Sequence, residues 1–133
     1  MLPQSDADFL AERMPGHSVT HEGGMICVLI PDYKLPPGFD RKSAALLLRL
    51  SPGYPDVRPD MWWFDPAVRR ADNAPIQATE VVEQYLGRQW QRWSRHLPDG
   101  VWRSGIDNLQ SYLALLQKEL RAVAAPVAGV PAR

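Results

Sequence analysis

The sequence has a single cysteine, no excess of charge of either sign and no long apolar run. Cys27 has no partner for an internal disulfide, which suits a reducing compartment such as the cytoplasm. The 15 Lys and Arg residues balance the 15 Asp and Glu residues, so no global charge attracts nucleic acid or anionic lipid. No apolar run approaches the ~20 residues of a membrane span. Asp6, Asp8 and Glu12 interrupt any signal peptide, and we expect a cytoplasmic protein.

What the sequence does contain is typical of one soluble domain. It has 133 residues, of which 45% are hydrophobic and 23% are charged. We expect the folded domain to cover residues 1–121. Residues 122–133 consist mainly of Ala, Pro and Val and carry no charge before the last residue, so we expect a disordered tail there.

Apolar patterning predicts a helix followed by three strands. Ser5 and an acidic first turn favour a helix over residues 6–14. Apolar runs bounded by turn residues predict strands over residues 25–30, 44–50 and 61–64. Their short connections predict an antiparallel meander. Residues 67–87 fit either a strand or a helical turn.

The most regular pattern lies near the C-terminal end. There, an apolar residue recurs every three or four positions, which is typical of one face of an amphipathic helix. We expect that face to pack on the sheet, and its members are Ile106, Leu109, Leu113, Leu116 and Leu120.

No metal-ligand motif stands out. His17, His21, Cys27 and His96 show neither the Cys-x2-Cys nor the His-Glu-x-x-His spacing. Cys27 also lies within an apolar run, where a free cysteine usually behaves as a small hydrophobe. We therefore expect no metal and no cofactor.

Arginine and tryptophan alternate loosely between residues 88 and 103. Such a segment resembles a stacking platform for nucleic acid, but the net charge is zero and no nucleic-acid-binding motif is present. Trp and Arg are also the residues most enriched at protein–protein hot spots. We therefore expect a protein partner and no nucleic acid.

Ser94 and His96 form the one candidate pair for nucleophilic chemistry. On a strand, residues two apart share a face, which would place a nucleophile beside a base. From periodicity alone, two surface residues in a polar segment is the simpler interpretation.

The order of elements and four aromatic or proline positions resemble the ubiquitin-conjugating (E2) fold. E2 enzymes carry a Tyr-Pro-x-x-Pro-Pro motif before a central strand, and this chain has Tyr54-Pro55 followed by Pro59. Trp102 and the helix after it are similar to the Trp and long helix that follow an E2 active site. The segment from Gly53 to Gly105 also resembles a bacterial group, prokaryotic E2 family E. Genes of that family sit beside genes for E1-like enzymes, ubiquitin-like proteins and JAB-type peptidases.

This resemblance covers roughly residues 5–120. It implies an α+β, E2/UBC (RWD-like) fold with an N-terminal helix, an antiparallel meander sheet and a C-terminal amphipathic helix. It also implies an E1-like activating enzyme and a ubiquitin-like protein as partners, with a JAB-type peptidase of the same pathway as a further one.

The resemblance leaves two functions open. In many E2 enzymes the nucleophilic cysteine lies eight residues before the Trp, and here that position is Ser94. Cys27 stands in the first expected strand, and no His-Pro-Asn triplet precedes Ser94. The chain is then either an E2-type acyl transferase that uses serine or a non-catalytic E2 variant that binds a ubiquitin-like protein or an E1-like partner.

In the transferase interpretation, Ser94 receives the ubiquitin-like protein as an oxyester and passes it to a target. His96 then acts as the general base. Arg95 or Arg92 stabilises the charge that develops on the acyl oxygen. The residues expected to contact the partners are Tyr54, Pro55, Trp90, Arg92, Trp93 and Trp102.

Overall fold

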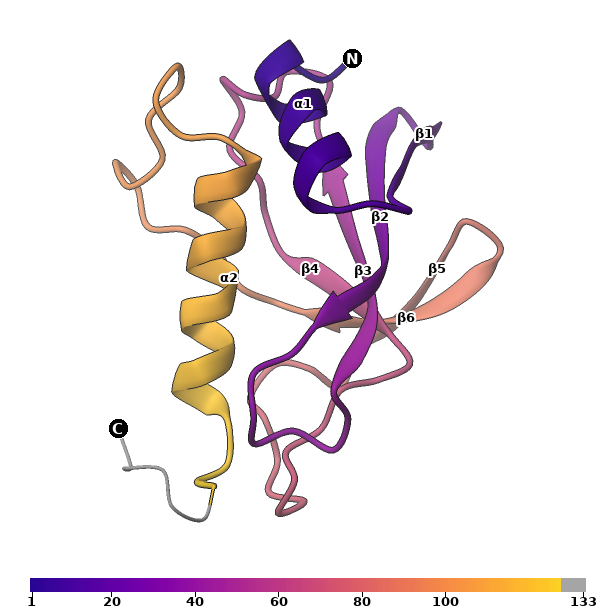
Figure 1. Cartoon of the computed structure of the whole chain (residues 1–133), viewed down its shortest axis with the longest axis vertical. Coiled ribbons are helices and arrows are strands. Elements are labelled where there is room, and N and C mark those ends of the chain that lie inside the picture. The colour runs from indigo at the N-terminus through magenta and orange to yellow at the C-terminus, as the bar shows by residue number, and fades with distance from the viewer. Residues whose placement is uncertain (128–133) are drawn as a thin grey trace.

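The computed structural model describes residues 1–127 and contains two helices and one six-stranded antiparallel sheet (Figure 1). The helices are α1 (Gln4–Arg13) and α2 (Leu109–Val123). The strands are β1 (Ser18–Glu22), β2 (Met25–Lys34), β3 (Ser43–Leu50), β4 (Trp62–Asp65), β5 (Val82–Tyr85) and β6 (Arg88–Trp93). Neighbouring strands follow the order β1-β2-β3-β4-β6-β5.

The predicted three-stranded meander is incomplete in two ways. The sequence gives no prediction of β1, because Val19 is its one apolar residue and its side chains are mostly exposed. β6 lies between β4 and β5, so the last part of the sheet is not a simple meander. The predicted α1 and the three predicted strands are confirmed to within a few residues, although Pro3 and not Ser5 stands at the helix start.

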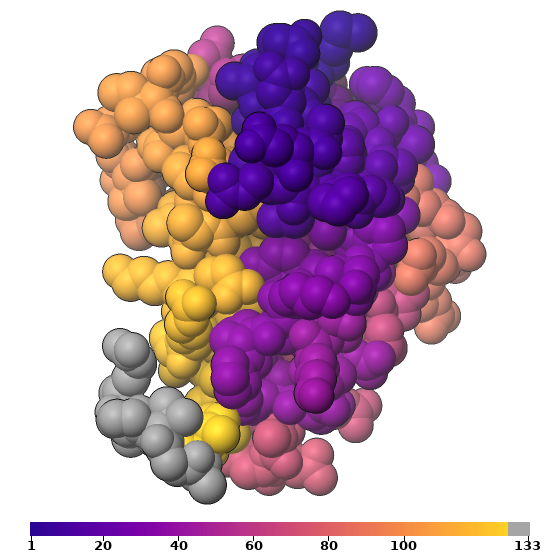
Figure 2. Space-filling view, in the orientation of Figure 1, coloured from indigo at the N-terminus to yellow at the C-terminus, as the bar shows by residue number. Residues whose placement is uncertain are grey.

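One face of the sheet is covered by both helices. Figure 2 shows the indigo α1 packed directly against the orange segment that precedes and begins α2. Trp93 lies at the centre of this core, where its ring stacks on Trp62 with 6.0 Å between centroids. The edge of Phe64 meets the same ring at 5.6 Å. These aromatic side chains fill the space between β4, β6 and α2.

The opposite face is closed by the curl of the sheet itself. Its core consists of Cys27, Ala45, Leu47, Trp63 and Trp90. The backbone N–H of Leu86, in the β5–β6 turn, donates to the carboxylate of Glu22 on β1 at 3.0 Å. This bond joins edge strand β1 to the turn of the β5–β6 hairpin at the other edge of the sheet. Cys27 is 0% exposed, which confirms the prediction that it is buried in an apolar strand.

The β5–β6 hairpin depends on a two-residue turn. Tyr85 pairs with Arg88, which leaves Leu86 and Gly87 as the loop. Both loop residues have positive φ, at 54° and 74°. A two-residue hairpin of the I′ type requires that conformation, and glycine adopts it without steric cost.

Helix α2 begins later than the apolar pattern predicts. Asn108 caps it, because its side chain accepts from the Ser111 N–H at 2.9 Å while the Ser111 hydroxyl accepts from the Asn108 N–H. Ile106 precedes this cap and is 63% exposed, so the prediction that it faces the sheet is wrong. The other four members of the stripe are buried as predicted: Leu109, Leu113, Leu116 and Leu120.

The folded unit extends past residue 121. α2 continues to Val123, and the N–H of the buried Ala125 donates to the Gly38 carbonyl at 3.1 Å. A Cβ on Gly38 would lie 2.4 Å from the Ala125 carbonyl oxygen, so this close approach requires glycine. Residues 122–127 therefore have a defined place, and the rest of the expected tail, 128–133, lies outside the described residues.

A leucine pair on α2 tests this packing. Leu116 is 1% exposed and Leu115 is 37% exposed, although they are adjacent in sequence. We expect Leu116→Ala to lower the free energy of unfolding by about 2–5 kcal/mol, because it leaves a cavity in the core. Leu115→Ala should change it by less than about 1 kcal/mol. Urea denaturation of both variants measures the difference, and equal losses would contradict the assigned helix face.

Candidate functional site

Ser94 lies directly after β6, where a fixed guanidinium reaches its hydroxyl. The Ser94 Oγ accepts a hydrogen bond from Arg92 Nε at 3.0 Å. Arg92 is held in turn by Glu83, at 3.2 Å, and Glu83 also accepts from the Trp63 indole at 2.9 Å. The backbone N–H of Ser94 donates to the Ala78 carbonyl at 3.0 Å. The hydroxyl therefore has a defined position beside a positive charge.

His96 is paired with an acid that the sequence motifs did not indicate. Its Nδ1 lies 2.5 Å from Asp60 Oδ1. An ionised carboxylate only accepts, so Nδ1 is the donor in this bond, and Nε2 is the acceptor nitrogen of the neutral imidazole. The pairing follows from a bond just beyond the β4–β6 ladder, where the Met61 N–H donates to the Arg95 carbonyl and brings position 60 opposite position 96.

Ser94 and His96 do not hydrogen-bond to each other in the described part of the chain. The Arg95 N–H donates to the Trp93 carbonyl at 3.0 Å, a tight turn that interrupts the alternation of the strand. Ser94 lines a cavity of about 570 Å³ with residues 75–78 and the end of α2. His96 lines another, of about 280 Å³, between Trp62 and α2. The alternation of side chains along a strand therefore does not describe how Ser94 and His96 lie relative to each other.

Arg95 ties the end of β6 to α2. Its Nε donates to Glu119 at 2.8 Å, and its terminal nitrogen donates to the Gln77 carbonyl at 2.9 Å. The guanidinium also lies over the Trp93 ring, 5.1 Å from its centroid. Of the two arginines considered for the acyl oxygen, Arg92 is therefore the one beside Ser94.

Most of the aromatic residues predicted as partner contacts are interior. Tyr54, Trp90 and Trp93 are at most 5% exposed, so their side chains offer no surface to a partner. Trp102 is half-buried, and its indole N–H donates to the Pro55 carbonyl at 2.8 Å. Composition suggested an interface, but burial assigns these side chains to packing.

Asp6 connects this region to the N-terminal helix. It is 2% exposed, and its two carboxylate oxygens accept from the Tyr54 hydroxyl at 2.7 Å and from the Leu109 N–H at 3.0 Å. Burial raises the pKa of the Tyr54 hydroxyl, and the bond to Asp6 raises it further, so Tyr54 stays a donor. The sequence marked Asp6 only as an acidic first-turn residue.

The loop between Ser94 and α2 is held against the turn around Tyr54. Besides the Trp102 bond, Arg58 pairs with Asp99 at 3.1 Å and the Ser104 hydroxyl donates to Asp56. Large apolar side chains remain exposed on these two segments: Val57, Val101 and Ile106. This end of the molecule combines a positioned loop with exposed apolar surface.

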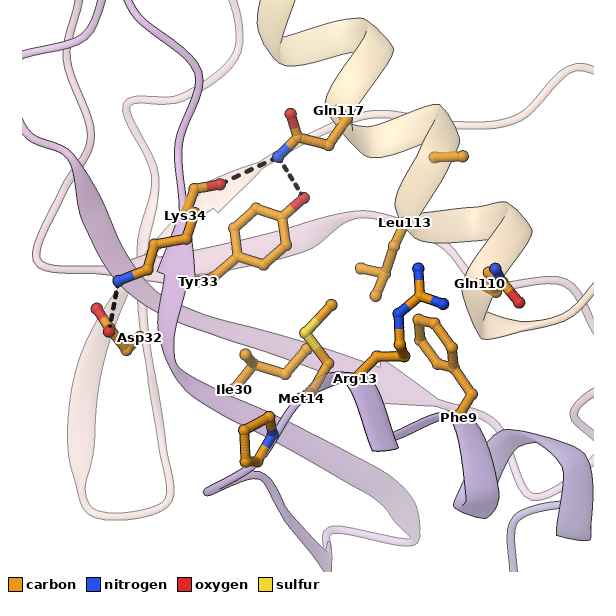
Figure 3. Close-up of a pocket in the computed structure, with 12 residues that line it drawn as sticks. Phe9, Arg13, Met14, Ile30, Asp32, Tyr33, Lys34, Gln110, Leu113 and Gln117 are labelled. Atoms are coloured by element: carbon orange, nitrogen blue, oxygen red, sulfur yellow. Dashed lines mark hydrogen bonds and ion pairs between the residues drawn. The ribbon is translucent and has the colours of Figure 1, made fainter. Parts of the chain in front are cut away.

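A separate cleft of about 540 Å³ lies between α1, β2 and α2 (Figure 3). Phe9, Met14 and Leu113 line it, and the side chain of Arg13 extends among them. At one end, Gln117 donates to the Tyr33 hydroxyl at 2.7 Å and to the Lys34 carbonyl at 3.1 Å (Figure 3). None of the predicted catalytic residues lines this cleft.

Residues 1–127 contain no group of three or more His, Cys, Asp or Glu side chains placed to hold a metal ion. Within the same residues, neither helix has the length and apolar character needed to cross a membrane.

Comparison with known proteins identifies one family. The sequence model of prokaryotic E2 family E matches residues 2–123, which include every helix and strand described above. Searches of the curated proteins and of the solved structures found no significant match.

The Asp6 network makes a stability prediction. Asp6→Ala removes the acceptor for both Tyr54 and Leu109, and an unsatisfied buried donor costs about 1–3 kcal/mol. We therefore expect a large loss of unfolding free energy in denaturant titrations. Asp8→Ala, an exposed change of the same charge on the same helix, should stay within about 0.5 kcal/mol of the parent. Similar losses in both variants would argue against the network.

Proposed function

The chain belongs to prokaryotic E2 family E, and on that basis we propose that it is the E2-like carrier of a prokaryotic ubiquitin-like conjugation pathway. Its partners are then an E1-like activating enzyme and a ubiquitin-like protein. A JAB-type peptidase of the same pathway would remove the modifier again.

The observation that best supports a carrier is the hydroxyl of Ser94 beside Arg92. In the proposed step, Ser94 Oγ attacks the activated C-terminal carbonyl of the ubiquitin-like protein on the E1-like enzyme. An ester C–O bond forms, and the bond from that carbonyl to the E1-like enzyme breaks. Arg92 Nε already donates to the attacking oxygen, and a guanidinium there stabilises negative charge as the hydroxyl loses its proton.

The serine proton needs an acceptor, because a hydroxyl is a weak nucleophile at neutral pH. We propose His96 for this role. Asp60 holds Nδ1, which leaves Nε2 to take the proton. Because Ser94 bonds to Arg92 and His96 bonds to Asp60, the proposed step requires the 94–96 segment to rearrange when the partner binds.

The alternative is a non-catalytic E2 variant that binds a ubiquitin-like protein or an E1-like partner. One observation favours it: in the described residues, the Ser94 hydroxyl bonds to Arg92 and to no base. The same family membership accommodates both functions, so the distinction rests on whether a covalent adduct forms.

Adduct chemistry separates the two functions. With the cognate E1-like enzyme, the ubiquitin-like protein and ATP, we expect intact mass to show an adduct that survives dithiothreitol and is lost in mild alkali or hydroxylamine. Ser94→Ala should abolish it, and Ser94→Cys should make it sensitive to thiols. Ser18→Ala, an exposed serine on β1, is the matched control and should load normally.

Two outcomes would count against Ser94 as the carrier. An adduct resistant to both thiol and alkali indicates an isopeptide on Lys34, Lys42 or Lys118. No adduct at all, with retained binding of the ubiquitin-like protein, leaves the non-catalytic variant as the function.

The loading rate tests the two supporting residues. We expect His96→Ala to slow adduct formation by ~10²–10⁴ if His96 is the general base, and Arg92→Gln to slow it by ~10²–10³. Cys27→Ser should load at the parent rate where it stays folded, while a buried hydroxyl lowers its stability by about 1–3 kcal/mol. Single-turnover gel assays measure the loading rates of all three variants. If Cys27→Ser lost loading while the other two variants kept it, Cys27 would be necessary for adduct formation.

A further inference from the structure

A small cavity on the sheet face opposite the helices is lined by an excess of positive charge. It encloses about 290 Å³ between β3, β4, β5, β6 and the 51–61 segment. Three guanidinium groups line it, with two carboxylates among them. These charged residues are Arg49, Arg58, Arg92, Asp60 and Glu83.

Most of these charges already have partners. Glu83 accepts from Arg92, from the Trp63 indole and, at 3.3 Å, from the Tyr85 hydroxyl. Asp60 pairs with His96, and Arg58 pairs with Asp99, a residue whose side chain is 98% exposed. Neither acidic group forms an ion pair with Arg49, since Glu83 pairs with Arg92 and Asp60 with His96.

Arg49 is the charged residue of this cavity that has no charged partner among the described residues. Within residues 1–127 it makes no ion pair, and its buried Nε has no hydrogen-bond partner. Its guanidinium lies over the Tyr85 ring, 3.8 Å from the centroid. A cation over a ring retains its in-plane N–H groups for other acceptors. Nε itself is closed to solvent, so the terminal nitrogens of the guanidinium, which donate to no acceptor within residues 1–127, are the donors left for an anion in the cavity.

We infer that this cavity binds the carboxylate of a polypeptide, either an acidic side chain or a chain terminus. A carboxylate carries one charge and matches the excess of one positive charge in the lining. A phosphate monoester carries about −1.5 to −2 near pH 7 and exceeds it. The guanidinium fork fits both carboxylate oxygens. Met25, Val57 and Met61 line the same cavity and contact the aliphatic carbons of the bound residue.

This site is distinct from the carrier function, although Arg92 touches both. The test therefore uses Arg49, which has no part in the proposed transfer. The probes are the α-amides of N-acetylglutamate and N-acetylglutamine, which differ in charge but hardly in shape, together with inorganic phosphate. Each is titrated into the full chain at constant ionic strength while NMR follows the Trp63 indole N–H, a group at the cavity wall.

We expect a saturable shift with the glutamate probe, a much weaker one with phosphate and none with the glutamine probe. Arg49→Gln should weaken glutamate binding by ~10-fold or more, which corresponds to ~1.4 kcal/mol. Arg69→Gln removes an exposed arginine outside the cavity and should bind like the parent. Arg49→Lys keeps the charge and loses the fork, so it should bind several-fold more weakly while remaining folded.

The inference fails if the acidic and neutral probes bind equally, if the glutamate probe gives no saturable shift, or if Arg49→Gln and Arg49→Lys both bind as the parent does. Tighter binding of phosphate than of glutamate would overturn the choice of a carboxylate. The indole resonance of Trp102, outside the cavity, checks that each variant is folded.

Discussion

The buried carboxylate of Asp6 is the contact on which the arrangement of the site depends. It binds Tyr54, 48 residues away in sequence, and Leu109, 103 residues away, so one side chain joins α1, the turn before β4 and the start of α2. A buried charge is tolerated only when its oxygens accept hydrogen bonds, and both do here. Pro55, next to Tyr54, accepts from Trp102 in the loop that follows Ser94. The loop beyond the candidate nucleophile is thus positioned from the N-terminal helix.

The other side of the site is positioned by the sheet. β6 pairs with β4, and this ladder places Arg92 beside Trp63, while the Met61–Arg95 backbone bond beyond it brings Asp60 opposite His96. Buried Gln91 secures the segment after β4, because its amide exchanges two hydrogen bonds with the backbone of Val68. A polar residue is acceptable in this core because both its amide oxygen and its amide nitrogen have hydrogen-bond partners. Ser94 therefore lies where the β6 ladder ends and the anchored loop begins.

Local patterns predicted the elements that bury a continuous apolar face. The leucines of α2 and the runs in β2 and β3 are of this kind. The sequence did not indicate contacts that depend on long-range pairing, such as Asp6 with Tyr54 or Asp60 with His96. Trp90 and Trp93 are three apart on a strand and so point to opposite faces. The sequence does not show that the sheet curls enough to bury both side chains, and for this reason it predicts them as partner contacts.

An arginine is required at position 92 because its side chain must donate hydrogen bonds in several directions at once. One guanidinium donates to the Ser94 hydroxyl and to Glu83 while it also lines the cavity that contains Arg49. A lysine ammonium is a single point of charge and has no planar fork with which to keep these directions at once. Glu83 fixes the plane of that fork, and the Trp63 indole fixes Glu83. The hydroxyl at the end of β6 is therefore oriented by a chain of hydrogen bonds that begins in the core of the curled sheet face. In the proposed loading step the serine hydroxyl therefore starts from a defined position, and what has still to be brought to it is the base.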